Sequence, residues 1–274
     1  MRLDEFLNAL KSLDLCEYQS EAFIFIEESF GVSRMELLAD RSRDFDTRAL
    51  TDFIEKRKEG IPLQHILGKW YFMGECYKVS PDCLIPRADT EAVVEVALSH
   101  LSDGGRVADL CTGSGCIGIS ILKNKPKTRA TLVDISERAL NIAKDNAKAL
   151  GVYDRCELIE GDVTKDILDG EYDMIISNPP YIKTNDIPSL SREVQREPIL
   201  ALDGGDDGLD IIKELLRFCP PHIKKGGYLV LEFGYDQGSD MEKLLDNSKK
   251  QGTISEYEMI YDYGKNIRGC IAKK

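Results

Sequence analysis

The sequence predicts an α/β protein in which a doubly wound, mostly parallel sheet follows a small helical region. Two observations support this prediction. After the glycine pair at 104–105, short apolar segments typical of buried strands alternate with longer segments of helical periodicity. In the first 75 residues, by contrast, apolar side chains recur three or four positions apart, as they do on one face of a helix. A chain of 274 residues is long enough for an α/β core and a second, smaller domain.

The helical region is predicted to span residues 1–75. Its apolar spacing is formed by Leu3, Phe6, Leu7, Leu10 and Leu13, and more loosely by Phe23, Phe25, Ile26 and Phe30. Residues 48–58 are expected to form a further helix. We expect this domain to recognise the substrate; the alternative is that it only caps the larger domain.

A β-hairpin is predicted next, because residues 70–72 and 76–79 flank a turn that contains Gly74. We assign residues 76–90 to the hairpin and linker and residues 91–274 to the α/β domain. A helix is expected at 89–101.

The remaining elements follow in alternation. Strands are predicted at 106–110, 129–134, 155–160, 172–177 and 227–233, and helices at 115–124, 136–150, 209–218 and 236–250. Two late strands, near 253–261 and 267–272, are joined by a short turn and must therefore be antiparallel. The sheet is expected to end in this hairpin.

The composition of the chain disfavours several classes of function. There are 48 acidic and 36 basic residues, for a net charge of −12, which disfavours nucleic acid as a substrate. No apolar run approaches the roughly 18 residues that cross a bilayer, and the start lacks the layout of a signal peptide, so we expect a cytoplasmic protein without membrane association. The eight cysteines form no CxxC pair and there are three histidines, so we expect reduced, mostly buried cysteines and no metal site.

The first strand of the sheet runs into a glycine-rich loop. This loop consists of Cys111, Thr112, Gly113, Ser114 and Gly115. Because glycine has no Cβ, such a loop lets a ligand approach the backbone closely. Gly113, Gly115 and Gly118 also satisfy the pattern GxGxxG, so a dinucleotide site is a rival interpretation.

Aspartates near the strand ends favour a nucleoside that carries a positive charge. Asp109 lies just before the loop, where a carboxylate attracts an ammonium or sulfonium group and repels a pyrophosphate. Asp134 ends the second strand, where an acid accepts hydrogen bonds from the ribose of either ligand. Asp162 is expected to reach the adenine amino group and Val163 to cover the ring. The alternatives are that Asp109 and Asp134 are helix N-caps or solvated loop residues, and that residues 161–163 form a plain turn.

The fourth strand is followed by a segment suited to holding an NH₂ group. The segment consists of Asn178, Pro179, Pro180 and Tyr181. The Asn178 side-chain carbonyl and the Pro179 backbone carbonyl can accept hydrogen bonds from the nitrogen, and Tyr181 can stack against a planar group. No ionised base is required, so catalysis would come from positioning and fixed dipoles. Without the loop upstream, the same residues would also suit a simple turn.

Together these segments resemble the HemK/PrmC family of peptide chain release factor glutamine methyltransferases. The resemblance covers nearly the whole chain and includes residues 62–68, 86–91, 111–118, 178–181, 197–198, 201–210 and 231–234. The segment 178–181 alone is shared with adenine methyltransferases, whereas the flanking segments are more specific.

The resemblance implies a class I S-adenosyl-L-methionine-dependent methyltransferase with a Rossmann-like seven-stranded sheet, a helical N-terminal domain and a hairpin linker. It implies that the acceptor is the glutamine of the GGQ motif in class 1 release factors. By position, the cofactor contacts are Asp109, residues 111–115, Asp134, Asp162, Val163 and Asn178, and the acceptor clamp is Asn178–Tyr181.

Three positions depart from the family pattern. Cys111 replaces the usual first glycine, Ala88 stands where a second proline is usual, and Val163 stands where some relatives have an aromatic residue. The first departure raises the question of whether this backbone position has a positive φ.

Three other functions remain as alternatives. The first is methylation of an adenine or cytosine amine in DNA or RNA. The second is an NAD-dependent oxidoreductase, in which Asp109 and the segment 178–181 have no role. The third is a binding module that has kept the nucleoside pocket without catalysis.

Overall fold

The computed structural model describes residues 1–13, 15, 17–165 and 167–274. The chain forms two compact units. The first comprises Met1–Lys69 with the short segment Ser191–Arg196, and the second comprises Trp70–Leu190 and Glu197–Lys274. The two units divide between residues 69 and 70, whereas the boundaries predicted from the sequence lie at 75/76 and 90/91. The hairpin belongs to the second unit because Phe72 and Tyr77 are part of that unit's hydrophobic core.

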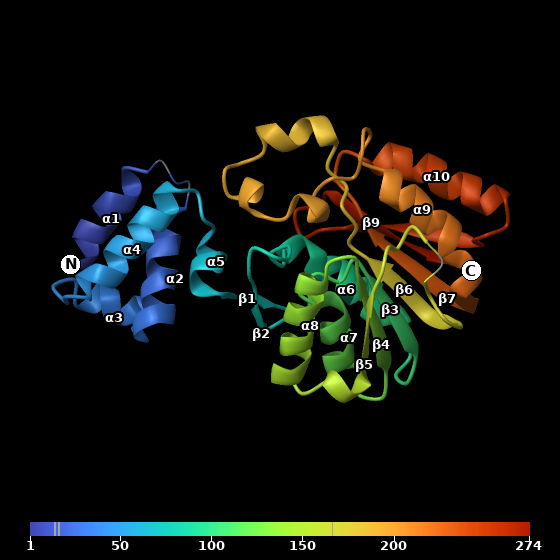
Figure 1. Ribbon diagram of the computed structural model, residues 1–274, viewed down its shortest axis with the longest axis horizontal. Helices are drawn as coiled ribbons and strands as arrows, with labels where there is room; N and C mark the ends of the chain where they lie inside the picture. Colours follow the sequence, from blue (N-terminus) through green and yellow to red (C-terminus); the bar gives the residue numbers. More distant parts are fainter. Residues whose placement is uncertain (14, 16, 166) are drawn as a thin grey trace. The chain divides into compact units, whose positions relative to one another are not determined.

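The first unit is helical, as predicted (Figure 1). Its helices are α1 (Leu3–Lys11), α2 (Tyr18–Phe30), α3 (Arg34–Ala39), α4 (Thr47–Lys58) and α5 (Leu63–Leu67). Aromatic rings from three helices meet in its core, where the Phe25 and Phe53 centroids are 4.1 Å apart and those of Phe6 and Phe53 are 5.6 Å apart. The buried Arg57 guanidinium forms ion pairs with Glu21 and with Glu193 of the segment 191–196.

The second unit contains the predicted doubly wound sheet. Its strands are β3 (Arg106–Leu110), β4 (Arg129–Asp134), β5 (Cys156–Glu160), β6 (Tyr172–Ser177), β7 (Ile223–Glu232), β8 (Glu256–Tyr261) and β9 (Ile267–Lys273). They lie in the order β5-β4-β3-β6-β7-β9-β8, and all pairs are parallel except those that involve β9. The predicted terminal antiparallel hairpin, β8–β9, is therefore confirmed.

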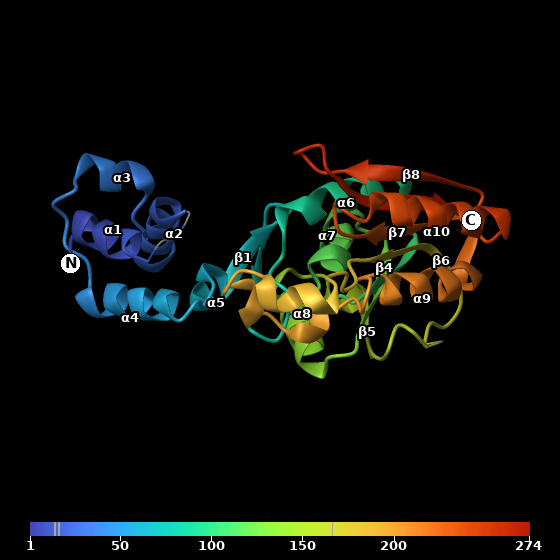
Figure 2. The same ribbon diagram turned by 90° about the horizontal axis from the view of Figure 1, so that it is seen from above.

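Helices cover both faces of the sheet (Figures 1 and 2). One hydrophobic core lies under α6 (Ala88–His100), α7 (Cys116–Asn124) and α8 (Glu137–Ala149). The other lies under α9 (Asp210–Phe218) and α10 (Gly238–Lys250). Successive strand residues alternate between the two cores, as Val107 and Ala108 do, because side chains of a strand point alternately to opposite faces.

Most predicted boundaries agree with the structure to within about two residues. The exceptions lie next to glycines. β7 begins at Ile223 and not at 227, because the strand continues past Gly226, whose φ is 81°, with a register shift against β6. β8 begins at Glu256 and not at 253, because Gly252 has a φ of 73° and the chain is still turning there.

The hairpin strands are β1 (Lys69–Phe72) and β2 (Glu75–Lys78). The long connection from β6 to α9 contains short 3₁₀ turns at Thr184–Ser189, Val194–Arg196 and Ile199–Ala201, which the sequence analysis did not predict.

The seven cysteines that the structure describes are free thiols, and Cys83, Cys116, Cys219 and Cys270 are buried as expected. Cys76 is exposed, contrary to the expectation, because it alternates outward on β2 while Tyr77 points into the core. Cys16 lies outside the described residues. Over the described part of the chain, no helix is both long and apolar enough to span a membrane, and no cluster of acidic, histidine or cysteine side chains is arranged to hold a metal ion.

Candidate active site

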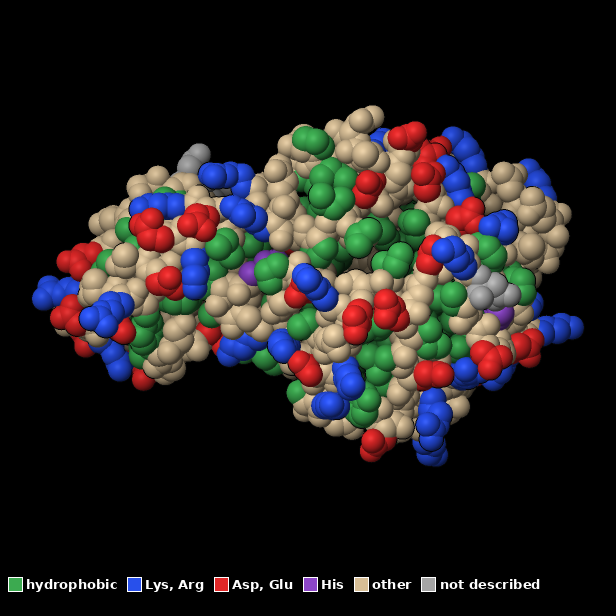
Figure 3. Space-filling model, in the orientation of Figure 1, with side chains coloured by type: hydrophobic (Ala, Val, Ile, Leu, Met, Phe, Trp, Pro, Cys, Tyr) green, Lys and Arg blue, Asp and Glu red, His purple; other side chains and the backbone are tan. Residues whose placement is uncertain are grey.

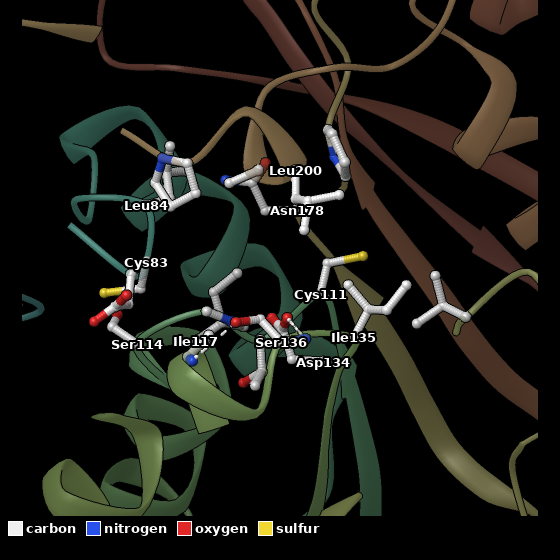
Figure 4. Close-up of a pocket in the computed structure, with 18 of the residues that line it drawn as sticks. Cys83, Leu84, Cys111, Ser114, Ile117, Asp134, Ile135, Ser136, Asn178 and Leu200 are labelled. Atoms are coloured by element: carbon white, nitrogen blue, oxygen red, sulfur yellow. Dashed lines mark hydrogen bonds between the residues drawn. The ribbon is translucent and has the colours of Figure 1, made fainter. Parts of the chain in front are cut away.

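The second unit contains a cavity of about 300 Å³ at the carboxyl ends of β3, β4 and β6. The chain runs from β3 outward to β4 and β5 on one side and from β6 to β7 on the other, so the cavity lies at the point where the strand order reverses. Hydrophobic side chains gather around the hollow in the middle of this unit (Figure 3). Figure 4 shows Asn178 and Leu200 at one end of the cavity, Cys111 in its middle, and Asp134 with Ser136 at the other end.

Most of the side chains predicted for the site meet in this cavity. Among the described residues, those that line it include Cys111, Thr112, Gly113, Ser114, Asp134, Asp162, Val163, Asn178 and Pro180. Four predicted residues are not among the lining residues: Asp109, Gly115, Pro179 and Tyr181. The lining residues that were not predicted from the sequence include Leu84, Arg87, Thr90, Ile135, Ser136, Ile199 and Leu200. Of these, Ile135 and Ser136 could have been found, because they directly follow Asp134 at the end of a strand.

The glycine-rich loop turns sharply between β3 and α7. Cys111 has a φ of 58°, so the position that glycine usually occupies does have a left-handed conformation here. For a residue with a side chain this conformation costs roughly 1–2 kcal/mol. Gly113 and Gly115 also have positive φ, of 55° and 80°. A Cβ at Gly115 would lie 2.8 Å from Ile119 Cδ1 and 3.0 Å from Ala143 Cβ, so a side chain there would crowd the packing of α7 against α8, although Gly115 does not line the cavity.

Asp109 lies beneath the loop and is fully buried. Its Oδ2 accepts hydrogen bonds from Thr112 Oγ1 at 2.6 Å and from the Gly118 backbone N–H at 2.9 Å, and so holds the loop to the start of α7. Its other oxygen, Oδ1, has no hydrogen-bond partner among the described residues. Burial raises the pKa of Asp109 to about 7, which the hydrogen bond from Thr112 partly counteracts. Direct contact of this carboxyl with a ligand stays a prediction.

The raised pKa of Asp109 predicts a decline in stability with rising pH. The folded carboxyl binds its proton more tightly than the unfolded one, so its stabilising contribution is full below about pH 4 and is lost as pH rises through the folded pKa of about 7. The Asp109→Asn variant should lack this decline. Between pH 4 and pH 8, its free energy of unfolding should rise relative to that of the wild type by up to about 4 kcal/mol. Urea unfolding of both proteins across this range measures the effect, and parallel pH curves would contradict the prediction.

Asp134, the last residue of β4, faces the cavity from the other side of the loop. Its Oδ2 accepts a hydrogen bond from the Gly113 N–H at 2.8 Å and its Oδ1 accepts one from the Ser136 N–H at 2.9 Å. Burial raises the pKa of this carboxyl above its ordinary value. Since each carboxylate oxygen has two lone pairs, Asp134 can still accept hydrogen bonds from two neighbouring hydroxyls.

Apolar surface lies beside these acids. Ile135 and Val163 both line the cavity, and Ile135 is 52% exposed. Asp162 accepts hydrogen bonds from the Thr164 hydroxyl at 2.6 Å and from the Thr164 N–H at 3.0 Å. Both bonds lower the pKa of Asp162, and the bond from the hydroxyl has the larger effect. A flat, uncharged ring with polar edges fits such a surface.

The segment after β6 places Asn178 at the opposite end of the cavity. Its Nδ2 donates a hydrogen bond to Thr90 Oγ1 at 3.3 Å. The Pro179 carbonyl accepts no hydrogen bond from the described residues. The Tyr181 hydroxyl lies 3.5 Å from Glu232 Oε1, and burial raises the pKa of this tyrosine. The Tyr181 ring packs with the core under α9 and α10, so its predicted stacking on an acceptor stays a prediction.

The backbone of this segment is supported from behind. The Gly204 N–H donates to the Ile182 carbonyl at 2.8 Å, and a Cβ at Gly204 would lie 2.7 Å from Tyr181 Cα. The buried Gln237 side chain donates from Nε2 to the carbonyls of Tyr181, at 3.0 Å, and Gly208, at 3.2 Å. Residues 180–182 therefore pack against the glycine-rich stretch 204–208.

Comparisons with known proteins identify the family of the chain. The family model of the PrmC N-terminal domain matches residues 3–68, and that of the methyltransferase small domain matches residues 89–196. A release factor glutamine methyltransferase from Moorella thermoacetica is 37% identical over 92% of this chain and 90% of its own length. One from Clostridium acetobutylicum is 36% identical over 93% of this chain and 91% of its own length.

Among solved structures, a methyltransferase from Pyrococcus furiosus has the same fold, with a TM-score of 0.53 and 19% identity over 84% of this chain and 99% of its own. The ribosomal protein L11 methylase from Lactobacillus delbrueckii subsp. bulgaricus has a TM-score of 0.52 and 18% identity over 75% of this chain and 89% of its own. With a glycine-rich loop, Asp134, Asp162 and Asn178 around one cavity, and with relatives this similar along nearly the whole chain, the protein is a methyltransferase that belongs to the release factor glutamine methyltransferase family.

Proposed function

We propose that this protein transfers a methyl group from S-adenosyl-L-methionine to the side-chain amide nitrogen (N5) of the glutamine in the GGQ motif of class 1 peptide chain release factors, in the cytoplasm. The relatives named release factor glutamine methyltransferase support the acceptor. The observation that carries the mechanism is that Asn178 lines one end of the same cavity whose other end is lined by Asp134. We propose further that the helical first unit docks the release factor.

The residues present fit the cofactor. Asp134 would hold the ribose hydroxyls, Ile135 and Val163 would cover the adenine, and Gly113, which has no Cβ, would let the ligand approach the loop closely. The buried carboxyl of Asp109, with one unpartnered oxygen among the described residues, puts a potential negative charge behind this loop. When bound, S-adenosyl-L-methionine supplies an electrophilic methyl group on a positively charged sulfur.

The chain's own residues have the task of holding a weak nucleophile. An amide nitrogen shares its lone pair with the neighbouring carbonyl, so it must be oriented and its hydrogens must be bound by acceptors. Because Asn178 Nδ2 is bound by Thr90, the Asn178 Oδ1 is the atom that can accept a hydrogen from the acceptor amide. The Pro179 carbonyl, which no described residue uses, is the second acceptor. The rate gain then comes from positioning and from fixed dipoles.

Mass spectrometry of a class 1 release factor incubated with the protein and cofactor tests the proposal. We expect a mass gain of one methylene, located by fragmentation on the glutamine of the GGQ motif, and no gain with Asn178→Ala over the same time. Parallel incubations with DNA and RNA use labelled cofactor. Label on nucleic acid and none on the release factor would overturn the proposal in favour of an adenine or cytosine methyltransferase, which the net charge of −12 disfavours.

A further inference from the structure

We propose that two buried carboxamides position the two ends of the cavity: Gln237 holds the segment that contains Asn178, and Asn146 holds the glycine-rich loop. This inference rests on the proposed function, because these ends are the ones assigned to the acceptor amide and to the cofactor. Neither Gln237 nor Asn146 is among the described residues that line the cavity. Each acts through hydrogen bonds to the backbone of a segment that does line it.

The Gln237 amide connects three loops at the carboxyl edge of the sheet. Gln237 is the N-cap of α10, but its side chain makes no capping hydrogen bond to that helix. Its Nε2 instead donates to the carbonyls of Tyr181, at 3.0 Å, and Gly208, at 3.2 Å, and its Oε1 accepts from the Gly234 N–H at 2.8 Å. The side chain is only 4% exposed, and each of its polar atoms is hydrogen-bonded.

The segment that contains Asn178 has few backbone groups by which it can be held. Pro179 and Pro180 lack a backbone N–H, and their carbonyls accept no hydrogen bond from the described residues. The segment is held beyond the prolines, where Gln237 binds the Tyr181 carbonyl. Because the proline rings fix φ at two successive positions, a displacement of Tyr181 is passed on to Asn178 and is not absorbed between them.

The Asn146 amide holds the glycine-rich loop in the same way. Asn146 lies in α8 and is 2% exposed. Its Nδ2 donates to the Ser114 carbonyl at 2.8 Å and to the Lys78 carbonyl at 3.0 Å, and its Oδ1 accepts from the Lys78 N–H at 2.7 Å. The amide therefore pairs with the end of β2 as a neighbouring strand would, and its other hydrogen holds Ser114, which lines the cavity.

Glycines leave the room that each amide needs. A Cβ at Gly208 would lie 2.7 Å from Gln237 Nε2. A Cβ at Gly115 would lie 3.0 Å from the Cβ of Ala143, which is one turn before Asn146 on α8. A side chain at either glycine would push the loop away from the amide that binds it, so loop and amide fit each other at both ends of the cavity.

Matched variants test the proposal, because each amide makes three hydrogen bonds. Gln237→Met and Asn146→Leu keep the approximate size of the side chain and remove all of these bonds, so we expect similar losses of stability in urea unfolding. In Gln237→Met, kcat on the release factor should fall about tenfold or more at saturating cofactor, while the affinity for S-adenosylhomocysteine stays within about threefold of the wild type.

The Asn146→Leu variant should show the opposite pattern. We expect its dissociation constant for S-adenosylhomocysteine, measured by calorimetry, to rise about tenfold or more, because the loop is no longer held in the conformation that binds the ligand. Its kcat at saturating cofactor should stay within about threefold of the wild type. A general loss of stability cannot produce this crossed pattern, since the two variants lose equal numbers of hydrogen bonds.

Nuclear magnetic resonance tests the positions without any reaction. In protein labelled with ¹⁵N in asparagine and glutamine, the side-chain NH₂ signals of Asn178 are assigned by their absence from Asn178→Asp. We expect these signals to shift in Gln237→Met and to keep their wild-type position in Asn146→Leu. The wild type provides a test that needs no destabilised variant: exchange of the Gln237 and Asn146 NH₂ hydrogens with solvent should be at least about a hundredfold slower than that of the exposed Gln251.

The outcomes separate the two proposals. Equal losses of kcat in the two variants, losses of stability without either kinetic change, or fast exchange of both amides in the wild type would each overturn the positioning roles. A missing effect in one variant alone overturns the role of that residue. If the wild type does not methylate a release factor, the proposed function fails, and the affinity for S-adenosylhomocysteine together with the Asn178 signals still decides the positioning roles.

Discussion

Replacement of Asn178 by alanine should lower kcat for release factor methylation by about a hundredfold or more, with a much smaller change in cofactor affinity. The variant removes the side-chain oxygen that is free to accept a hydrogen from the acceptor amide, because Nδ2 is already bound by Thr90. The acceptor amide nitrogen is a poor nucleophile, and without Asn178 it loses the orientation that is the main contribution of this site to the rate. The fold should change little, since Asn178 lies on the loop after β6 and lines a cavity.

The measurement is single-turnover kinetics with saturating cofactor, combined with calorimetry for S-adenosylhomocysteine. Asn124→Ala is a matched control, because Asn124 ends α7 and its Nδ2 donates to the Ser120 carbonyl at 2.9 Å, outside the cavity. We expect the control to keep wild-type turnover. Turnover by Asn178→Ala within a few-fold of the control would exclude Asn178 from the acceptor site and would favour a binding module without catalysis.

Gly208→Ala should have the second large effect, on both stability and turnover. Gly208 has a φ of 75°, and a Cβ there would collide with the Tyr181 carbonyl and lie 2.7 Å from Gln237 Nε2. The left-handed conformation costs roughly 1 kcal/mol for alanine, and overpacking adds about 1–3 kcal/mol. Because the obstructing atom is the backbone of the segment that follows Asn178, relief of the collision must displace that segment. We therefore expect kcat to fall by about tenfold or more along with the stability.

Gly252→Ala is the matched control for this variant. Gly252 also has a positive φ, of 73°, but a Cβ there would meet nothing within 4 Å. It should lose only the roughly 1 kcal/mol that belongs to the backbone conformation and keep its turnover. Urea unfolding and steady-state kinetics of both variants isolate the collision. Equal losses of stability in the two variants would show that stretch 204–208 does not support the loop.

Local patterns in the sequence were sufficient for the order of the elements. The alternation of strands and helices, the terminal hairpin and the loop between β3 and α7 were all predicted to within a few residues, because hydrophobic periodicity and glycine placement are properties of short segments. The same holds for Asp134 and Asn178, which follow from one rule: polar residues at the carboxyl ends of parallel strands meet at one edge of a sheet.

Where the local signal was ambiguous, the three-dimensional packing decided. The family pattern raised the question of a positive φ at Cys111, but only the structure answered it with a φ of 58°, since cysteine rarely adopts this conformation. Tyr181 is attractive as a stacking partner in the sequence, but its ring packs with the core under α9 and α10 and its hydroxyl lies beside Glu232. Segment 191–196 is far in sequence from the helices of the first unit but clusters with them, and its Glu193 forms an ion pair with Arg57.

The sequence by itself determined the fold class and the family resemblance, because each depends on residues that are close together along the chain. Only the tertiary structure showed how Asn178 is held: Thr90, 88 residues away in the sequence and in the first turn of α6, accepts a hydrogen bond from the Asn178 side-chain nitrogen. The reason is physical. A side chain's hydrogen-bond partner is set by strand register and by the layer packed above it, and neither is written in any short stretch of sequence.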